Sequence, residues 1–337
     1  SANVVSTFSV IIVNSTLVIE GDGSGLASAA CVANAATVSD VTLVARRSNI
    51  RVAAATETNV FACVGSVAVT DFTSVLSNVM IVAEDSHVRA TNLNKGGAVA
   101  FGVVGFVLLE PFDVSVATAS VLSLRSVVNT TSAANVRSPH VALGIVCFTT
   151  LGAVALHAET VSILAYSSSI VANGGGLAQA AVGIAVFSSA GSVANLFATS
   201  TVLAAVRDGF VMSVTWSKGI SVAVGVAHWV ATVGALTLKL ANATMAAAFN
   251  TTVTSRSHGT DEVGVTVALG VGCWSNGGCA WTVRHTVVAA WQNCSLRMAR
   301  VSGAAAAAVA GMTAMGVVLR NDLVLSNTTL AVAFNCS

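Results

Sequence analysis

A short phrase that recurs along the chain limits what it can fold into. Alanine, an apolar residue, glycine and a second apolar residue follow one another, and an aromatic residue stands four positions after the glycine. The glycines of the five clear copies are Gly102, Gly144, Gly183, Gly225 and Gly270, separated by 42, 39, 42 and 45 residues. A degenerate sixth copy is expected around Gly311, and eroded copies around Gly65 and Cys31. A period of about 40 residues is typical of a protein built from stacked repeats.

The segments inside each repeat have the pattern of β-strands. Apolar residues often alternate with polar or small ones, as in 221–226 and 236–240, which is the period of a strand. Val and Thr are frequent, and only the alanine run at 304–308 favours a helix. Each repeat therefore predicts a strand, a tight turn, a second strand, a variable loop, a third strand, a glycine-containing turn and a fourth strand. Strands that repeat without intervening helices stack as parallel coils, because neighbouring repeats then satisfy each other's backbone hydrogen bonds.

The predicted fold is all-β: a right-handed parallel β-helix, or β-solenoid, with repeats of about 40 residues. Residues 1–337 are expected to form a single segment of about eight such repeats. The chain starts at Ser1, and its last repeat stops at 335–337 without a polar capping segment. We therefore expect a segment of a larger repetitive protein, with the flanking segments of that protein as its neighbours.

Composition excludes two classes of protein and leaves one alternative fold. Hydrophobic residues make up 55% of the chain and charged residues 9%, the reverse of a disordered protein. The net charge is +1 and no basic run occurs, so nucleic acid is not expected as a partner. The uncharged stretch 160–206 and the apolar stretch 303–319 are long enough for membrane helices, which leaves a polytopic membrane protein as an alternative. Serine and glycine clusters and the absence of an aromatic belt favour strands instead.

Seven Asn-x-Ser/Thr sequons mark candidate N-glycosylation sites. They begin at Asn14, Asn129, Asn242, Asn250, Asn293, Asn327 and Asn335. All except Asn242 and Asn335 are expected at the same solvent-facing turn of their repeats, where other repeats carry residues such as Arg47 and Asp85. A glycan at such a turn would leave the stacked strands undisturbed. The alternative is that asparagine and threonine simply suit a tight turn.

The seven cysteines show no C-x-x-C spacing, so we expect no metal site, and we expect no cofactor. Cys31 and Cys63 are expected at equivalent positions of adjacent repeats, where their α-carbons would be close enough for a disulfide. A stack of small buried residues is the alternative for this pair. His228 is expected to be a packed core residue.

The carboxylates are scattered, with adjacent pairs only at Glu84-Asp85 and Asp261-Glu262, and no catalytic residue is identified. An enzyme that acts on carbohydrate from a β-helix, a lyase or a hydrolase, would need three or four carboxylates on one face of adjacent repeats. This class stays an alternative to a binding protein.

The aromatic residues of the recurring phrase form a ladder. Its members are Phe106, Phe148, Phe187, Trp229 and Trp274. If these side chains turn inward, they pack as a stack in the core. If they turn outward, they form an apolar stripe that docks a partner, a lipid or a sugar. The sequence leaves both interpretations open.

These features together resemble a known family. The period, the strands rich in Val, Ala, Ser and Thr, and the sequon-bearing turns are similar to those of the large repetitive surface proteins of kinetoplastid protists, of the dispersed gene family type. The resemblance implies a β-helical ectodomain in a large, membrane-associated, glycosylated protein with an adhesive role. We therefore expect a non-enzymatic structural or adhesive segment at the cell surface or outside the cell. It would be attached to the membrane through parts outside this segment, and its ligand would be a carbohydrate or a protein.

Overall fold

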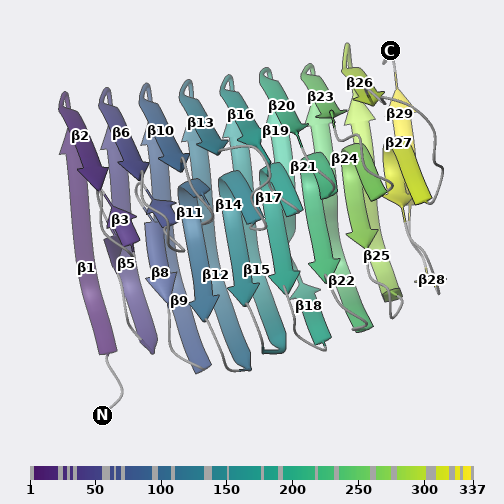
Figure 1. Ribbon diagram of the computed structural model, residues 1–337, viewed down its shortest axis with the longest axis horizontal. Coiled ribbons are helices and arrows are strands. Elements are labelled where there is room, and N and C mark those ends of the chain that lie inside the picture. The colour runs from purple at the N-terminus through teal and green to yellow at the C-terminus, as the bar shows by residue number, and fades with distance from the viewer. Residues whose placement is uncertain are drawn as a thin grey trace.

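The computed structural model consists of β-strands that form three parallel sheets (Figure 1). Successive repeats follow one another along the long axis of the molecule, from the N-terminal to the C-terminal end. The structure describes residues 4–21, 26–28, 31–32, 36–54, 61–63, 66–69, 73–92, 98–107, 111–132, 139–149, 152–175, 178–188, 193–216, 219–230, 235–258, 263–274, 279–300, 309–318, 323–326 and 329–334. All 29 elements within these ranges are strands, which confirms the predicted all-β class.

Sheet A contains the first strand of each repeat. Its strands are β1 (Val4–Val13), β5 (Thr37–Arg46), β9 (Thr73–Glu84), β12 (Phe112–Leu124), β15 (Val154–Tyr166), β18 (Val193–Thr199), β19 (Val202–Arg207), β22 (Ala235–Phe249), β25 (Cys279–Trp291), β28 (Leu323–Ser326) and β29 (Thr329–Phe334).

Sheet B contains the short second strands. They are β2 (Thr16–Gly21), β6 (Asn49–Ala54), β10 (His87–Asn92), β13 (Val127–Ser132), β16 (Ser169–Gly174), β20 (Phe210–Thr215), β23 (Thr252–Ser257) and β26 (Ser295–Arg300).

Sheet C contains the strands that carry the recurring phrase. They are β3 (Leu26–Ser28), β4 (Cys31–Val32), β7 (Phe61–Cys63), β8 (Ser66–Val69), β11 (Ala98–Val107), β14 (Pro139–Thr149), β17 (Ala178–Ser188), β21 (Gly219–Val230), β24 (Val263–Trp274) and β27 (Val309–Val318). Each strand pairs in parallel with its equivalent in the next repeat, as β14 does with β17. One repeat is therefore one wide rung that contributes a strand to each sheet. The predicted glycine-containing turn and fourth strand are wrong for the five clear copies of the phrase, because their glycines lie inside single continuous strands.

Each long strand of sheet A contains one residue with positive φ near its middle, and the equivalent residue of the sixth rung, Ser200, lies between β18 and β19. These residues are Thr7, Asp40, Asn78, Thr118, Thr160, Ser200, Asn242 and His285. In β15 the buried side chains are Leu156 and Ala158 before Thr160, and Val161 and Ile163 after it. The extra residue shifts the alternation by one position, as a β-bulge does. Both halves of the strand can then bury their aliphatic side chains in one core.

A second row of positive-φ residues forms the turn between sheets A and B. It contains Asn14, Arg47, Asp85, Arg125, Ser167, Asp208 and Asn250, with Gln292 and Asn293 in the last described turn. The residue after each turn position is commonly a buried serine. The Ser86 hydroxyl donates to the carbonyl of Glu84 (2.7 Å) and accepts from the Ser48 backbone N–H (3.1 Å). The Ser126 hydroxyl repeats this pattern with Leu124 and Ser86, so a ladder of hydroxyls satisfies the backbone groups that the turn would otherwise leave unpaired.

The glycines of the recurring phrase lie directly above one another in sheet C. Gly144 pairs with Gly183 and Gly183 with Gly225, and the φ angle of Gly183 is +138°. A Cβ atom on Gly183 would lie 1.8 Å from the carbonyl oxygen of Gly225. The predicted glycine row is confirmed for the five clear copies. It is wrong for the sixth, because Gly270 pairs with Gly316 and Gly311 pairs with Val265.

The strands of sheet C are buried on both faces, unlike those of sheets A and B. Every residue from Val141 to Cys147 is buried, for example. β24 bends at Gly270, so a Cβ on Gly272 would lie 2.5 Å from a methyl group of Ile220 and 3.1 Å from one of Val265. Double-sided burial explains why so few charged residues are needed in the sequence.

The stretches that suggested membrane helices contain strands wherever the structure describes them. Residues 160–206 contribute to β15, β16, β17, β18 and β19. Residues 309–318 form β27, and the alanine run at 304–308 lies outside the described residues, as does Gly65. Among the residues that the structure describes, no helix has the length and apolar character needed to cross a membrane.

Candidate functional site

The aromatic ladder of sheet C is aligned as predicted, but at Phe187 it does not form an exposed stripe. Phe106 pairs with Phe148, Phe148 with Phe187, Phe187 with Trp229, and Trp229 with Trp274. The Phe187 side chain is fully buried. The outward interpretation is therefore wrong at Phe187, because strands of sheet C bury both faces. The side chains of the other four members lie outside the described part.

The sequons differ in where the structure places them. Asn14, Asn250 and Asn293 are exposed and lie at the turn between sheets A and B, as predicted. Asn242 is exposed at the mid-strand row of sheet A. The turn prediction is wrong for Asn129, which lies within β13 and has a buried Oδ1 atom, whereas Arg125 occupies the turn. Asn327 and Asn335 lie outside the described residues.

The equivalence of Cys31 and Cys63 is wrong. Cys63 pairs with Ser28, and Cys31 pairs with Ser66, so the two cysteines are offset by three positions along the strands. Their α-carbons therefore do not stand directly opposite each other, and the geometric basis of the predicted disulfide is lost. Cys147, in contrast, is a free and buried cysteine, and the buried Cys294 thiol donates to the carbonyl of Trp291 (3.1 Å).

Two histidines are buried in the core, of which the sequence identified one. His228 is fully buried in β21, as predicted. His140, at the start of β14, is also buried, and neither of its ring nitrogens has a hydrogen-bond partner in the described part of the chain. Burial lowers the pKa of both imidazoles to about 3, since a charged ring cannot be solvated there. Both residues are therefore neutral at physiological pH.

Charged side chains form an ionic row along the turns of the N-terminal rungs. Arg125 lies 2.7 Å from Asp85 and 3.0 Å from Glu84, and Arg46 lies 2.6 Å from Glu84. The Arg125 guanidinium, which donates a hydrogen bond to Asp85, holds the pKa of that carboxyl below its usual value. These groups are exposed, so they contribute little to stability and mainly neutralise one another across rungs.

A polar cluster lies on the outer face of sheet A, in the N-terminal halves of its strands. His157 stacks on Phe197 with ring centroids 4.7 Å apart, and its Nε2 atom lies 3.6 Å from Asp113. The Lys239 ammonium lies 5.4 Å from the centre of the Phe197 ring. Glu159 is on the next rung from Asp113 but four positions farther along the strand. In the described residues, no three His, Cys, Asp or Glu side chains are grouped so that they could hold a metal ion.

On the same outer face, the C-terminal ends of the strands form a groove that the sequence analysis missed. We define the aromatic groove by Tyr166, Arg207, Phe249 and Trp291 at its rim and by Ala205 and Ala247 at its floor. The four rim residues are the last residues of β15, β19, β22 and β25, and they pair in sequence across the strands. Each stands directly before a turn residue, which is the signal that could have revealed the row from the sequence.

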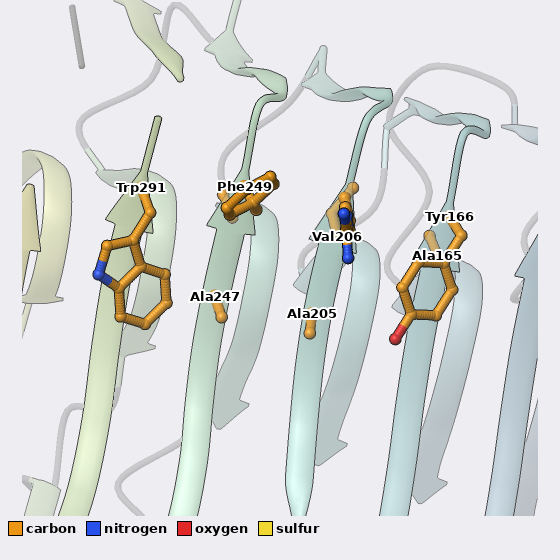
Figure 2. Close-up of a pocket in the computed structure, with 9 residues that line it drawn as sticks. Ala165, Tyr166, Ala205, Val206, Ala247, Phe249 and Trp291 are labelled. Carbon is orange, nitrogen blue, oxygen red and sulfur yellow. The ribbon is translucent and has the colours of Figure 1, made fainter. Parts of the chain in front are cut away.

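The rings at the two ends of the aromatic groove are exposed, whereas the Phe249 ring between them is half-buried. Tyr166 and Trp291 are each 38% exposed, and Figure 2 shows both rings extending down over the outer surface of their strands. Three strand spacings separate them, which is about 14 Å. The small side chains of Ala205 and Ala247 lie between these rings and leave the floor low. The groove therefore offers two flat apolar platforms at either end of a shallow bed.

Planar polar groups border this groove on its turn side. The Arg207 guanidinium carbon lies 4.9 Å from the centre of the Phe249 ring, and its Nε donates to Asp208 (3.1 Å). The second oxygen of Asp208 accepts a hydrogen bond from the Asn250 side-chain amide (2.8 Å). This network runs across two rungs and fixes donors and acceptors beside the aromatic rings.

A second exposed aromatic pair lies at the end of sheet B. Trp216 is 46% exposed, stacks on His258 at 4.4 Å, and donates its indole N–H to Asn173. Neither residue lines the aromatic groove, so Trp216 is an exposed tryptophan outside that groove. No family model, curated protein or solved structure matches this chain, and the site is therefore interpreted from its own geometry.

Proposed function

We propose that this chain is a non-enzymatic adhesive segment of a glycosylated cell-surface protein, and that its aromatic groove binds carbohydrate. The observation that carries the proposal is the row of rings at Tyr166, Phe249 and Trp291, of which the two outer rings are exposed, bordered by Arg207 and Asp208. Sugars present an apolar C–H face and a rim of hydroxyl groups. Aromatic platforms match the first, and planar donors and acceptors match the second.

We further propose that the stacked rungs wind as a right-handed parallel β-solenoid. Parallel crossover connections are right-handed in nearly all known sheets, because a right-twisted strand returns to its sheet most directly in that sense. Such a rod repeats the same outward position on every rung. A groove built from four successive rungs can therefore follow an extended oligosaccharide that runs along the rod axis.

The test compares Trp291→Ala and Tyr166→Ala with the matched control Trp216→Ala. The variants are produced in bacteria, so that they carry no N-glycan, and are first compared by circular dichroism to establish that the β-structure is retained. They are then screened on a glycan array. Glycans bound by the unsubstituted protein are titrated by calorimetry. We expect affinity to fall about tenfold or more in the two groove variants, because each loses a stacking platform, and to stay unchanged in Trp216→Ala. Equal affinity in all three variants, or no glycan bound by the unsubstituted protein, would refute the proposal.

A further inference from the structure

The sequon asparagine Asn250 lies at the centre of the turn side of the aromatic groove. It follows Phe249 directly, it is exposed, and its φ angle is +46°. Its backbone N–H donates to the carbonyls of Trp291 (3.1 Å) and Gln292 (2.9 Å), which fixes the asparagine to the next rung. Its side-chain amide donates to Asp208 on the preceding rung (2.8 Å). The asparagine is therefore held on both sides, and its side chain extends toward the preceding rung, which carries Arg207 and Asp208.

We propose that an N-linked glycan on Asn250 lies over the aromatic groove and limits the access of other ligands to it. This inference rests on the proposed function, because it names the regulation of the same site. In the transfer step, the Asn250 amide nitrogen forms a bond to the anomeric carbon of a lipid-pyrophosphate-linked oligosaccharide. The bond from that carbon to the pyrophosphate breaks, the lipid pyrophosphate leaves with the electron pair, and the amide loses one proton.

The hydrogen bond to Asp208 explains why the glycan would be directed into the groove. A glycosylated amide retains one N–H, so it can still donate to the Asp208 carboxylate. With that bond kept, the first sugar starts between the rungs of Arg207 and Phe249, beside the floor residue Ala247. The rings on either side then provide the nearest apolar surface for its C–H face.

The other sequons that the structure describes lack this placement. Asn242 lies on the same strand, but eight residues earlier, which is about 26 Å along an extended strand. Asn14 is on the first rung, Asn129 lies within β13 with a buried Oδ1 atom, and Asn293 lies at the turn of the end rung of the groove, two residues after Trp291. Asn250 is thus the sequon whose glycan would start above the groove floor.

The experiment uses two substitutions of the sequon threonine in protein secreted from eukaryotic cells. Thr252→Val removes the sequon but keeps the size of the side chain, and Thr252→Ser keeps the sequon. Peptide mass spectrometry measures the occupancy of Asn250 in both. A cysteine introduced as Ala247→Cys then reports access to the groove floor through its rate of reaction with a maleimide. Ser120→Cys, an outward and half-buried position on β12, serves as the control.

We expect Asn250 to be occupied in the Thr252→Ser protein and the cysteine at 247 to react at least threefold more slowly there than in the Thr252→Val protein. The cysteine at 120 should react equally fast in both. An unoccupied Asn250, or equal rates at 247 despite occupancy, would overturn the inference. Glycan-array binding by the Thr252→Val protein separates the two proposals: protection at 247 without any glycan binding refutes the adhesive function and leaves the covering glycan standing.

Discussion

Replacing Gly183 by alanine tests whether the stacked glycines are required by the close approach of neighbouring rungs. The added Cβ would lie 1.8 Å from the carbonyl oxygen and 2.8 Å from the carbonyl carbon of Gly225. These atoms belong to the backbone of the next rung and cannot rotate away. The φ angle of +138° adds backbone strain of about 1–3 kcal/mol for a residue with a Cβ. Relief of the overlap separates β17 from β21 locally and breaks two or three hydrogen bonds of about 1 kcal/mol each.

We therefore expect Gly183→Ala to lower the free energy of unfolding by about 3–6 kcal/mol. Ala181→Gly is the matched control, since it exchanges the same two residue types on the same strand and should cost only about 1 kcal/mol. Guanidinium unfolding followed by circular dichroism measures the difference. Amide hydrogen exchange should place the loss of protection in β17 and β21, because stacked repeats contact only their neighbours. A Gly183→Ala protein as stable as Ala181→Gly would refute the steric explanation.

Two further predictions concern buried polar groups. Because the pKa values of His140 and His228 are about 3 in the folded state and near 6.5 when unfolded, the unfolded chain binds more protons between these values. The free energy of unfolding should be constant above pH 6.5 and should be lower by about 4 kcal/mol at pH 5. Denaturant titrations between pH 7.5 and 4.5 measure it, and a free energy that does not change with pH would contradict the burial of the two histidines. Ser126→Ala leaves the buried Ser86 N–H without its acceptor and should lower the free energy of unfolding in urea by about 1–3 kcal/mol. Ser126→Thr is the control, because it retains the hydroxyl. Equal losses of stability in the two variants would argue against the hydroxyl ladder.

The glycine period was enough to predict the class of fold, because glycine and aliphatic residues repeat wherever strands stack. It failed near the ends of the chain, where the phrase is degraded. Gly316 lies in register with Gly270, although the residue four positions after Gly316 is not aromatic. Gly311 resembles the phrase more closely in the sequence, because a large apolar residue, Met315, stands four positions after it. The predicted equivalence of Cys31 and Cys63 was wrong for the same reason, because only the strand pairing reveals an offset of a few residues.

The candidate site was harder to predict than the fold. The sequence emphasised aromatic residues within the phrase, and Phe187 proved to be buried because β17 is covered on both faces. The exposed rings belong instead to Tyr166 and Trp291, with the half-buried Phe249 between them, and the outward direction of all three depends on the strand phase. That phase is reset by the positive-φ residues of sheet A, such as Thr160 and Asn242. Simple alternation counted along the sequence therefore assigns half of each long strand to the wrong face.

The unequal lengths of the repeats have a consequence for how such a chain can change over generations. The distances between successive phrase glycines vary from 39 to 46 residues, yet the paired glycines stay aligned from Gly102 to Gly316. In sheet C extra residues are therefore accommodated between strands, whereas in sheet A some pairings shift register by one residue within the strands. Gene duplication or loss that adds or deletes a whole rung would preserve every type of contact, whereas a single-codon deletion inside β14 or β17 would move a side chain into the glycine row. Natural variants should accordingly differ by entire units and by the lengths of the connecting segments.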